Sequence, residues 1–158
     1  MTEKRRNTLK AVLTGIIALT ITSFFVHSLM PSEVSSAESE GVASMLSAIL
    51  SPDTPFGAFV INNVRKIAHF CEYGVLGLEL ALYTVLLVKN KKRGIIYASA
   101  FAHSVAFIDE SLQIISGRGP MIADVWLDML GFAVFFGASL ALSYFIAKIK
   151  RQKEKQHG

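Results

Sequence analysis

The chain has 158 residues, the length of one domain, and 52% of them are hydrophobic while only 18% are charged. With a mean hydropathy of +0.46, this composition excludes a disordered chain and is too apolar for most soluble domains. The net charge of +4 does not indicate nucleic-acid binding, because the basic residues form three short clusters beside apolar runs, as in membrane topology. Cys71 is the only cysteine, which excludes an internal disulfide and a thiolate metal site.

The first apolar run covers residues 11–29 and follows a basic segment at residues 1–10. About nineteen apolar residues suffice to cross roughly 30 Å of hydrocarbon, so we expect a transmembrane helix here. A cleaved signal peptide is the alternative, because Ser35, Ser36 and Ala37 are small enough for a signal-peptidase site. The apolar run is long for a signal peptide, which favours the uncleaved helix.

Residues 30–63 are expected to form an extracellular loop. Its Ser/Glu-rich beginning is polar, and Pro52 and Pro55 interrupt two short apolar runs that could not span a bilayer. Either a short amphipathic segment on the membrane surface or a loop that caps a site fits this composition.

Three further apolar runs cover about residues 64–88, 94–115 and 122–147. We therefore predict an all-α fold, a polytopic bundle of four transmembrane helices that forms a single membrane domain over residues 1–158. The N-terminal segment, the loop at 89–93 and the tail at 148–155 hold 4, 4 and 5 of the 16 Lys and Arg residues. The positive-inside rule then places both termini in the cytoplasm and residues 30–63 on the outer side of the membrane.

The run at 64–88 begins with an unusual set of ionisable side chains. A helix turns about 100° per residue, so five side chains fall on one stripe roughly 80° wide: Arg65, His69, Glu72, Leu76 and Glu79. Lys66 and Tyr73 flank this stripe. Ionisable residues inside a membrane-length segment are costly and by default indicate a functional site.

The two following runs bring acidic groups to the same outer depth. Asp109, Glu110 and Gln113 lie near the outer end of the third run, and Asp124 and Asp128 lie one turn apart at the start of the fourth. Glu110 continues a four-residue repeat of small side chains, a pattern that lets helices approach closely. This repeat consists of Gly94, Ala98, Ala102 and Ala106. We therefore expect the acids to point into the bundle.

These residues resemble the VanZ-like family of small bacterial membrane proteins over about residues 60–140. The resemblance rests on separated motifs in the expected order: Lys66-x-x-His69-Phe70-x-Glu72-Tyr73-x-x-Leu76, Asp109-Glu110-x-x-Gln113, Gly117-Arg118, Asp124-Val125 and Gly131. The chain departs from the family pattern at Asp128, where asparagine is usual. The resemblance implies a membrane bundle in the cell envelope and an association with resistance to glycopeptide antibiotics such as teicoplanin. It does not imply a reaction.

Two chemistries remain open for the acidic and histidine residues. His69 and Glu72, three residues apart on a helix, could bind a metal, could act as a general acid–base pair together with Asp109 and Glu110, or could join a structural ion-pair network. The carboxylates of Asp109, Glu110, Asp124 and Asp128 could hold a divalent cation, or Arg65, Lys66 and Arg118 could neutralise them directly.

Three functions follow as hypotheses. The first is binding of a lipid-linked cell-wall precursor, another anionic envelope ligand or a glycopeptide in an outward-facing pocket. Ligand contacts are then expected from Arg65, Lys66, Tyr73, Gln113, Arg118, Asp124 and Asp128. The second is a membrane hydrolase or transferase that uses the same pocket. The third is a small transporter, which the apolar inner halves of the helices disfavour.

Overall fold

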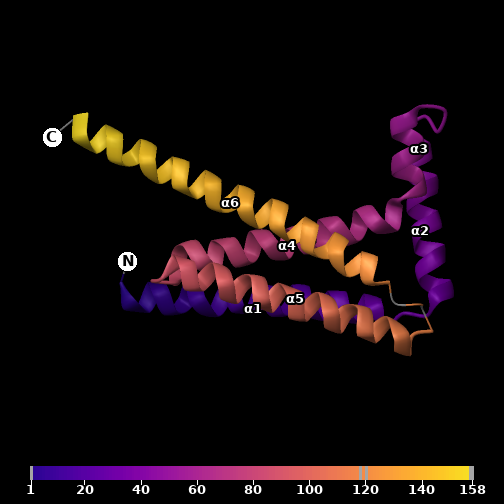
Figure 1. The fold of residues 1–158 in the computed structure, drawn as a ribbon, viewed down its shortest axis with the longest axis horizontal. Helices are drawn as coiled ribbons and strands as arrows, with labels where there is room; N and C mark the ends of the chain where they lie inside the picture. The colour runs from indigo at the N-terminus through magenta and orange to yellow at the C-terminus, as the bar shows by residue number, and fades with distance from the viewer. Residues whose placement is uncertain (1, 118, 120, 157–158) are drawn as a thin grey trace.

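The computed structural model describes residues 2–117, 119 and 121–156, which form six α-helices. Their bounds are α1 Glu3–Ser28, α2 Ser32–Ser47, α3 Pro55–Asn62, α4 Val64–Leu87, α5 Lys91–Ile115 and α6 Ile122–Gln156. Helices α1, α4 and α5 run alongside one another, and α6 crosses α4 before its second half projects beyond the bundle (Figure 1). The predicted all-α class is confirmed.

Among the described residues, three helices are long and apolar enough to cross a membrane: α1, α4 and α6. Helix α5 does not meet the same criterion, although it has 25 residues, or roughly 37 Å at 1.5 Å per residue. The basic first turn of α5 and the acidic groups near its C-terminal end lower its mean hydropathy. The fourth spanning segment therefore stays a prediction. The three helices that can span a bilayer agree with the predicted membrane protein.

Local sequence explains where several helices begin and end. The hydroxyl of Thr54 accepts a hydrogen bond from the Gly57 N–H at 3.1 Å, and Pro55 occupies the first turn of α3, where its missing N–H costs nothing. Asn90 caps α5 in the same way through the Arg93 N–H, at 3.1 Å. The Lys91 ammonium donates to the last free carbonyls of α4, those of Thr84, Val85 and Val88, at 2.6–2.9 Å.

The segment between α1 and α4 differs from the expected loop. It forms α2 and α3, which stand across one end of the bundle (Figure 1). The two prolines interrupt the chain as expected, but Pro55 also starts a helix, because proline is compatible with the first helical turn. Helical structure thus covers most of residues 30–63.

The core lies mainly between α4, α5 and α6, and α1 contributes Ile17 and Phe24. The small-residue repeat on α5 is buried as predicted, and Ala102 and Ala106 have no exposed surface. Helices α4 and α6 approach so closely that a Cβ at Gly77 would lie 2.7 Å from the Phe132 carbonyl oxygen. A Cβ at Gly131 would overlap the Phe70 backbone, so only glycine permits this crossing.

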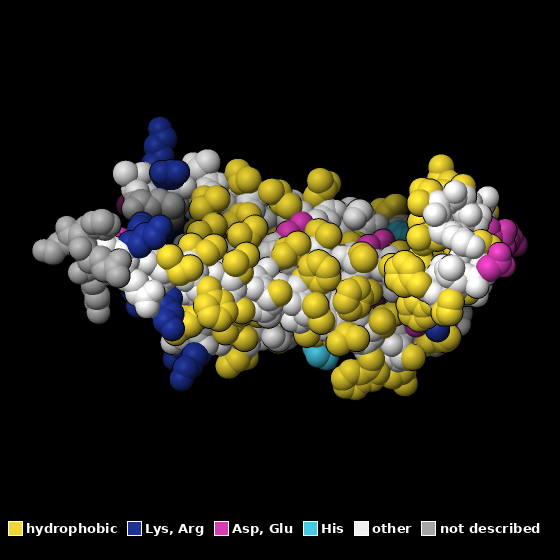
Figure 2. Space-filling model, turned by 90° about the horizontal axis from the view of Figure 1, so that it is seen from above, with side chains coloured by type: hydrophobic (Ala, Val, Ile, Leu, Met, Phe, Trp, Pro, Cys, Tyr) yellow, Lys and Arg dark blue, Asp and Glu magenta, His cyan; other side chains and the backbone are white. Residues whose placement is uncertain are grey.

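The surface separates by charge. Lys and Arg side chains gather at the end that holds the N-terminus and the start of α5, acidic side chains occur at the opposite end, and an apolar band lies between them (Figure 2). The tail at 148–155 extends α6 as a helix up to Gln156. Many large apolar side chains are exposed, among them Leu19 at 74% and Phe107 at 69%, as expected for a surface in contact with lipid.

Candidate functional site

Four buried side chains from three helices meet near the end of the bundle where α2 and α3 stand, which is the end predicted to face outward. They are His69 of α4, Asp109 and Glu110 of α5, and Asp128 of α6, and we call them the buried cluster. Each offers one ligating atom, and these atoms lie within 4.8 Å of one another. Their exposed fractions are 7%, 2%, 4% and 0%. The predicted inward orientation of the acids on α5 and of Asp128 is therefore confirmed.

His69 and Asp128 face each other across the α4–α6 interface, with His69 Nδ1 3.3 Å from Asp128 Oδ1. This contact is an ion pair when the imidazole is protonated. Within the described part of the chain, His69 Nδ1 and both Asp128 oxygens have no hydrogen-bond partner. Buried polar atoms are rarely left unsatisfied, which makes these two residues a candidate for ligand binding.

The two acids of α5 are held by neighbouring groups. The Ser28 hydroxyl at the end of α1 donates to Asp109 Oδ1 at 2.5 Å. The Gln113 amide donates to Glu110 Oε1 at 2.6 Å, and the Met121 N–H donates to Glu110 Oε2 at 3.2 Å. These bonds fix the orientation of both carboxylates, because each donor sits on a different segment of the fold.

Arg65 approaches the buried cluster only indirectly. Its Nη2 donates to Gln113 Oε1 at 2.9 Å, and Gln113 in turn bonds Glu110. In the described residues, no Lys or Arg nitrogen lies within 4.0 Å of the three carboxylates. Neither Arg65 nor Lys66 therefore neutralises these carboxylates by direct contact. The third predicted cation, Arg118, lies outside the described residues.

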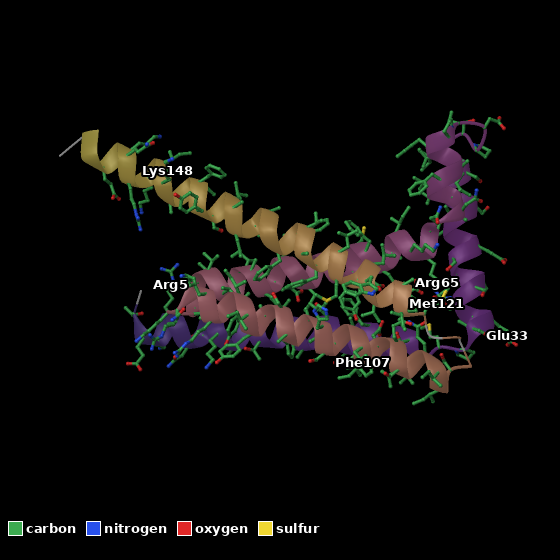
Figure 3. The ribbon with its side chains drawn as sticks, in the orientation of Figure 1. Arg5, Glu33, Arg65, Phe107, Met121 and Lys148 are labelled. Atoms are coloured by element: carbon green, nitrogen blue, oxygen red, sulfur yellow. The ribbon has the colours of Figure 1, made fainter. Side chains whose placement is uncertain are left out.

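A cavity of about 420 Å³ opens at the same end of the molecule. Arg65 and Lys66 line it from the start of α4, and Asp124 lines it from the first turn of α6. Figure 3 shows Arg65 and Met121 close together at this end, beside the start of α2. The remaining lining residues are Ser32, Asn62, Asn63, His69, Gly117, Gly119 and Met121. We call this space the outer cavity, and His69 belongs both to its wall and to the buried cluster.

Glu72 and Tyr73 lie away from the outer cavity. The Glu72 carboxylate turns to α1, where Oε1 is 3.6 Å from His27 Nδ1, and His27 Nε2 is 3.5 Å from Glu38. Tyr73 has no exposed surface and packs against Phe24, with the ring centroids 5.2 Å apart. The expected pairing of His69 with Glu72 is thus replaced by the pairing of His69 with Asp128.

Sequence reasoning missed the contributions of α1 and α3. Ser28 and His27 end an apolar helix in which no polar periodicity drew attention to them, and only the bundle geometry brings Ser28 to Asp109. Asn62 and Asn63 lie at the α3–α4 junction and line the outer cavity. Their position directly before Arg65 and Lys66 is the sequence feature from which a contribution to the same site could have been predicted.

A larger groove of about 880 Å³ lies at the opposite, basic end of the molecule. Lys4 and Arg5 of α1 border it together with Leu86 of α4. Its described lining contains no His, Asp or Glu, so it offers no group for acid–base chemistry or metal binding.

Residues 12–145 match the family model VanZ/LLP1. The chain belongs to the VanZ/LLP1 family. The match extends from α1 into α6 and includes every residue of the buried cluster and the outer cavity. Among curated proteins and among solved structures, none matches the chain.

Chemically, a VanZ/LLP1 protein with this arrangement combines two features. The outer cavity presents cationic and amide donors, which suit an oxyanion. The buried cluster presents an imidazole and three carboxylates, which suit a proton or a metal cation. Because His69 belongs to both, the two features are contiguous.

Proposed function

We propose that this protein binds the anionic head group of a lipid-linked cell-wall precursor in the outer cavity, from the outer face of the bacterial plasma membrane. The observation that carries the proposal is the lining of that cavity. Arg65 and Lys66 are exposed side chains at its wall, and Asn62 and Asn63 add amide groups.

The cationic side chains suit a phosphate or diphosphate. A guanidinium donates two parallel hydrogen bonds to such an oxyanion, and an ammonium adds a point charge. The Arg65 guanidinium already donates a hydrogen bond to Gln113 Oε1 at 2.9 Å. Arg65 therefore has less conformational freedom to lose when a ligand binds. The lipid part of the ligand would remain in the bilayer, against the apolar side chains that the helices expose.

Resistance to glycopeptides follows as a consequence within this proposal. A protein that holds the lipid-linked precursor would lower the amount that is accessible to teicoplanin at the outer membrane face. Expression of the wild-type chain is then expected to raise the teicoplanin concentration that inhibits growth, and the same expression of Arg65→Gln is not.

Binding is tested with the full chain in lipid nanodiscs that contain an undecaprenyl-linked diphosphate. Arg65→Gln and Lys66→Gln are expected to weaken binding by at least tenfold each. The matched control is Lys92→Gln, which removes an exposed charge in the first turn of α5. Equal affinity of the wild type and both cavity variants would contradict the proposal.

A second candidate is a hydrolase or transferase that acts on the phosphate of the same ligand. The observation that favours it is His69, which lines the outer cavity and also contacts Asp128 at 3.3 Å, as a general acid or base with a supporting carboxylate would. Phosphate release that His69→Gln abolishes without loss of ligand binding would support the enzyme. A transport pathway has less support, because the described core inward of the cluster is dominated by Leu80, Ala98, Phe132 and Phe136.

A further inference from the structure

We propose that the buried cluster, His69, Asp109, Glu110 and Asp128, is a binding site for one divalent metal cation, of the kind that accepts both imidazole and carboxylate ligands. This inference does not depend on the proposed ligand of the outer cavity, since the four residues are defined by their mutual geometry. Zn²⁺ and Mn²⁺ are the two cations whose chemistry fits the set.

The distances are those of a site that closes around an ion. The four ligating atoms lie within 4.8 Å of one another, whereas donors around a tetrahedral zinc lie about 3.3 Å apart, given metal–ligand distances of about 2.0–2.1 Å. One contact, from His69 Nδ1 to Asp128 Oδ1, is already 3.3 Å. The set is complete when the ligating oxygens of the two α5 acids move inward from within 4.8 Å to about 3.3 Å of the other donors.

A second, independent observation comes from the unsatisfied atoms. Asp128 has no exposed surface, and neither of its oxygens has a hydrogen-bond partner in the described residues. His69 is 7% exposed, and its Nδ1 is in the same situation. Three buried polar atoms therefore lie together without a hydrogen-bond partner in that part of the chain, and two of them, His69 Nδ1 and Asp128 Oδ1, are only 3.3 Å apart. A metal ion bound between them would satisfy all three.

The negative charges of the buried cluster favour a divalent over a monovalent cation. Three carboxylates and one imidazole share this space, and the described Lys and Arg side chains form no ion pair with them. Like charges at such distances disfavour ionisation of all three acids unless a cation is present. A dication compensates two of the three negative charges. The Arg65 guanidinium donates to Gln113, which in turn donates to Glu110, so the positive charge of Arg65 lies near the Glu110 carboxylate.

The surrounding hydrogen bonds resemble those that orient metal ligands. Ser28 holds Asp109, Gln113 and the Met121 N–H hold Glu110, and each donor comes from outside the ligand set. Such outer contacts fix ligand orientation and are a regular part of metal sites. His69 also lines the outer cavity, which gives the ion an access route from the outer face.

The test uses the full chain, purified in detergent, stripped with a chelator, exposed to Zn²⁺ or Mn²⁺ and dialysed. Elemental mass spectrometry is expected to find one ion per chain for one of the two metals. The same metal is expected to raise the melting temperature progressively with its concentration, because it binds the folded chain. Wild-type protein that retains neither metal would overturn the proposal.

Variants assign the ion to the cluster. His69→Gln and Asp128→Asn keep side-chain volume, remove a ligating group or its charge, and are expected to lower metal affinity at least tenfold. Glu79→Gln is the matched control, because it changes a partly buried carboxylate on the same helix as His69 that instead bonds Thr20 at 2.7 Å. Undiminished metal affinity in both cluster variants, or equal loss in Glu79→Gln, would overturn the assignment.

Gel filtration of each metal-free variant distinguishes a folding defect from a loss of metal binding, because a folded variant elutes as one monodisperse species. If one cluster variant is not monodisperse, Glu110→Gln replaces it with the same expectation. The metal-dependent rise in melting temperature should then vanish in every folded cluster variant and persist in Glu79→Gln. Persistence of the rise in a folded cluster variant would contradict the proposal.

Discussion

The imidazole of His69 and the carboxylate of Asp128 meet across the α4–α6 interface, with Nδ1 3.3 Å from Oδ1 and no exposed surface on the aspartate. Removal of one partner leaves the other buried without compensation, and such losses cost about 3–5 kcal/mol for charged pairs. In the presence of a chelator, His69→Ala is expected to lower the free energy of unfolding by an amount in this range. Denaturation of the purified protein in detergent measures it.

The double variant separates this pairing from a simple cavity. When Asp128→Asn removes the charge that His69 faces, a further His69→Ala change is expected to cost less than it does in the wild type. The coupling energy from the four proteins is expected to exceed about 0.5 kcal/mol. Additive effects of the two changes would show that the residues do not act as a pair.

The close crossing of α4 and α6 gives a prediction at Gly131. Gly131→Ala places a methyl group into the Phe70 backbone and is expected to destabilise the protein by about 1–3 kcal/mol, since the helices must move apart. Gly137→Ala on the same helix meets no atom within 4 Å. It is expected to be neutral or slightly stabilising, and a loss equal to that of Gly131→Ala would contradict the packing.

Ser28 connects the end of α1 to the buried cluster. Ser28→Ala removes the donor to Asp109 Oδ1 and leaves a buried acceptor unpaired, which is expected to cost about 1–3 kcal/mol. Ser23→Ala is the control, because the exposed Ser23 hydroxyl bonds only the Thr20 carbonyl within α1. Equal melting temperatures for the two variants would argue against the bond between Ser28 and Asp109.

The predicted topology is tested by cysteine labelling in a Cys71→Ala background. Asp53→Cys, between α2 and α3, is expected to react with a membrane-impermeant maleimide in intact cells. Lys92→Cys, at the basic end, is expected to react only after permeabilisation, because the positive-inside rule places this end in the cytoplasm. Labelling of Lys92→Cys in intact cells would reverse the orientation.

The sequence predicted the buried face of α5 well, because helical periodicity alone places Ala98, Ala102 and Ala106 in line with Glu110. It did not identify Asp128 as the side chain that His69 contacts. Spacing along one helix shows that His69 and Glu72 share a face, but not which neighbouring helix each side chain meets. Here Glu72 turns to His27 of α1, whereas His69 turns to Asp128 of α6.

The segment between α1 and α4 was predicted less well for a related reason. Pro52 and Pro55 were interpreted only as interruptions, although proline also fits the first turn of a helix, where Thr54 caps α3. Contacts across the bundle, such as that of Ser28 with Asp109, depend on how the helices are arranged in space. No local pattern encodes them.

The hydrogen bond between Ser28 and Asp109 joins positions 81 residues apart, and this has a consequence for biogenesis. As the chain leaves the ribosome, α1 is complete first and can receive Asp109 when α5 emerges. Asp128 arrives later, on the last helix. A chain arrested between the two would expose a half-built polar centre within the bilayer, where unsatisfied groups are costly. We therefore expect chains that end before α6 to be degraded faster by membrane proteases than the full chain.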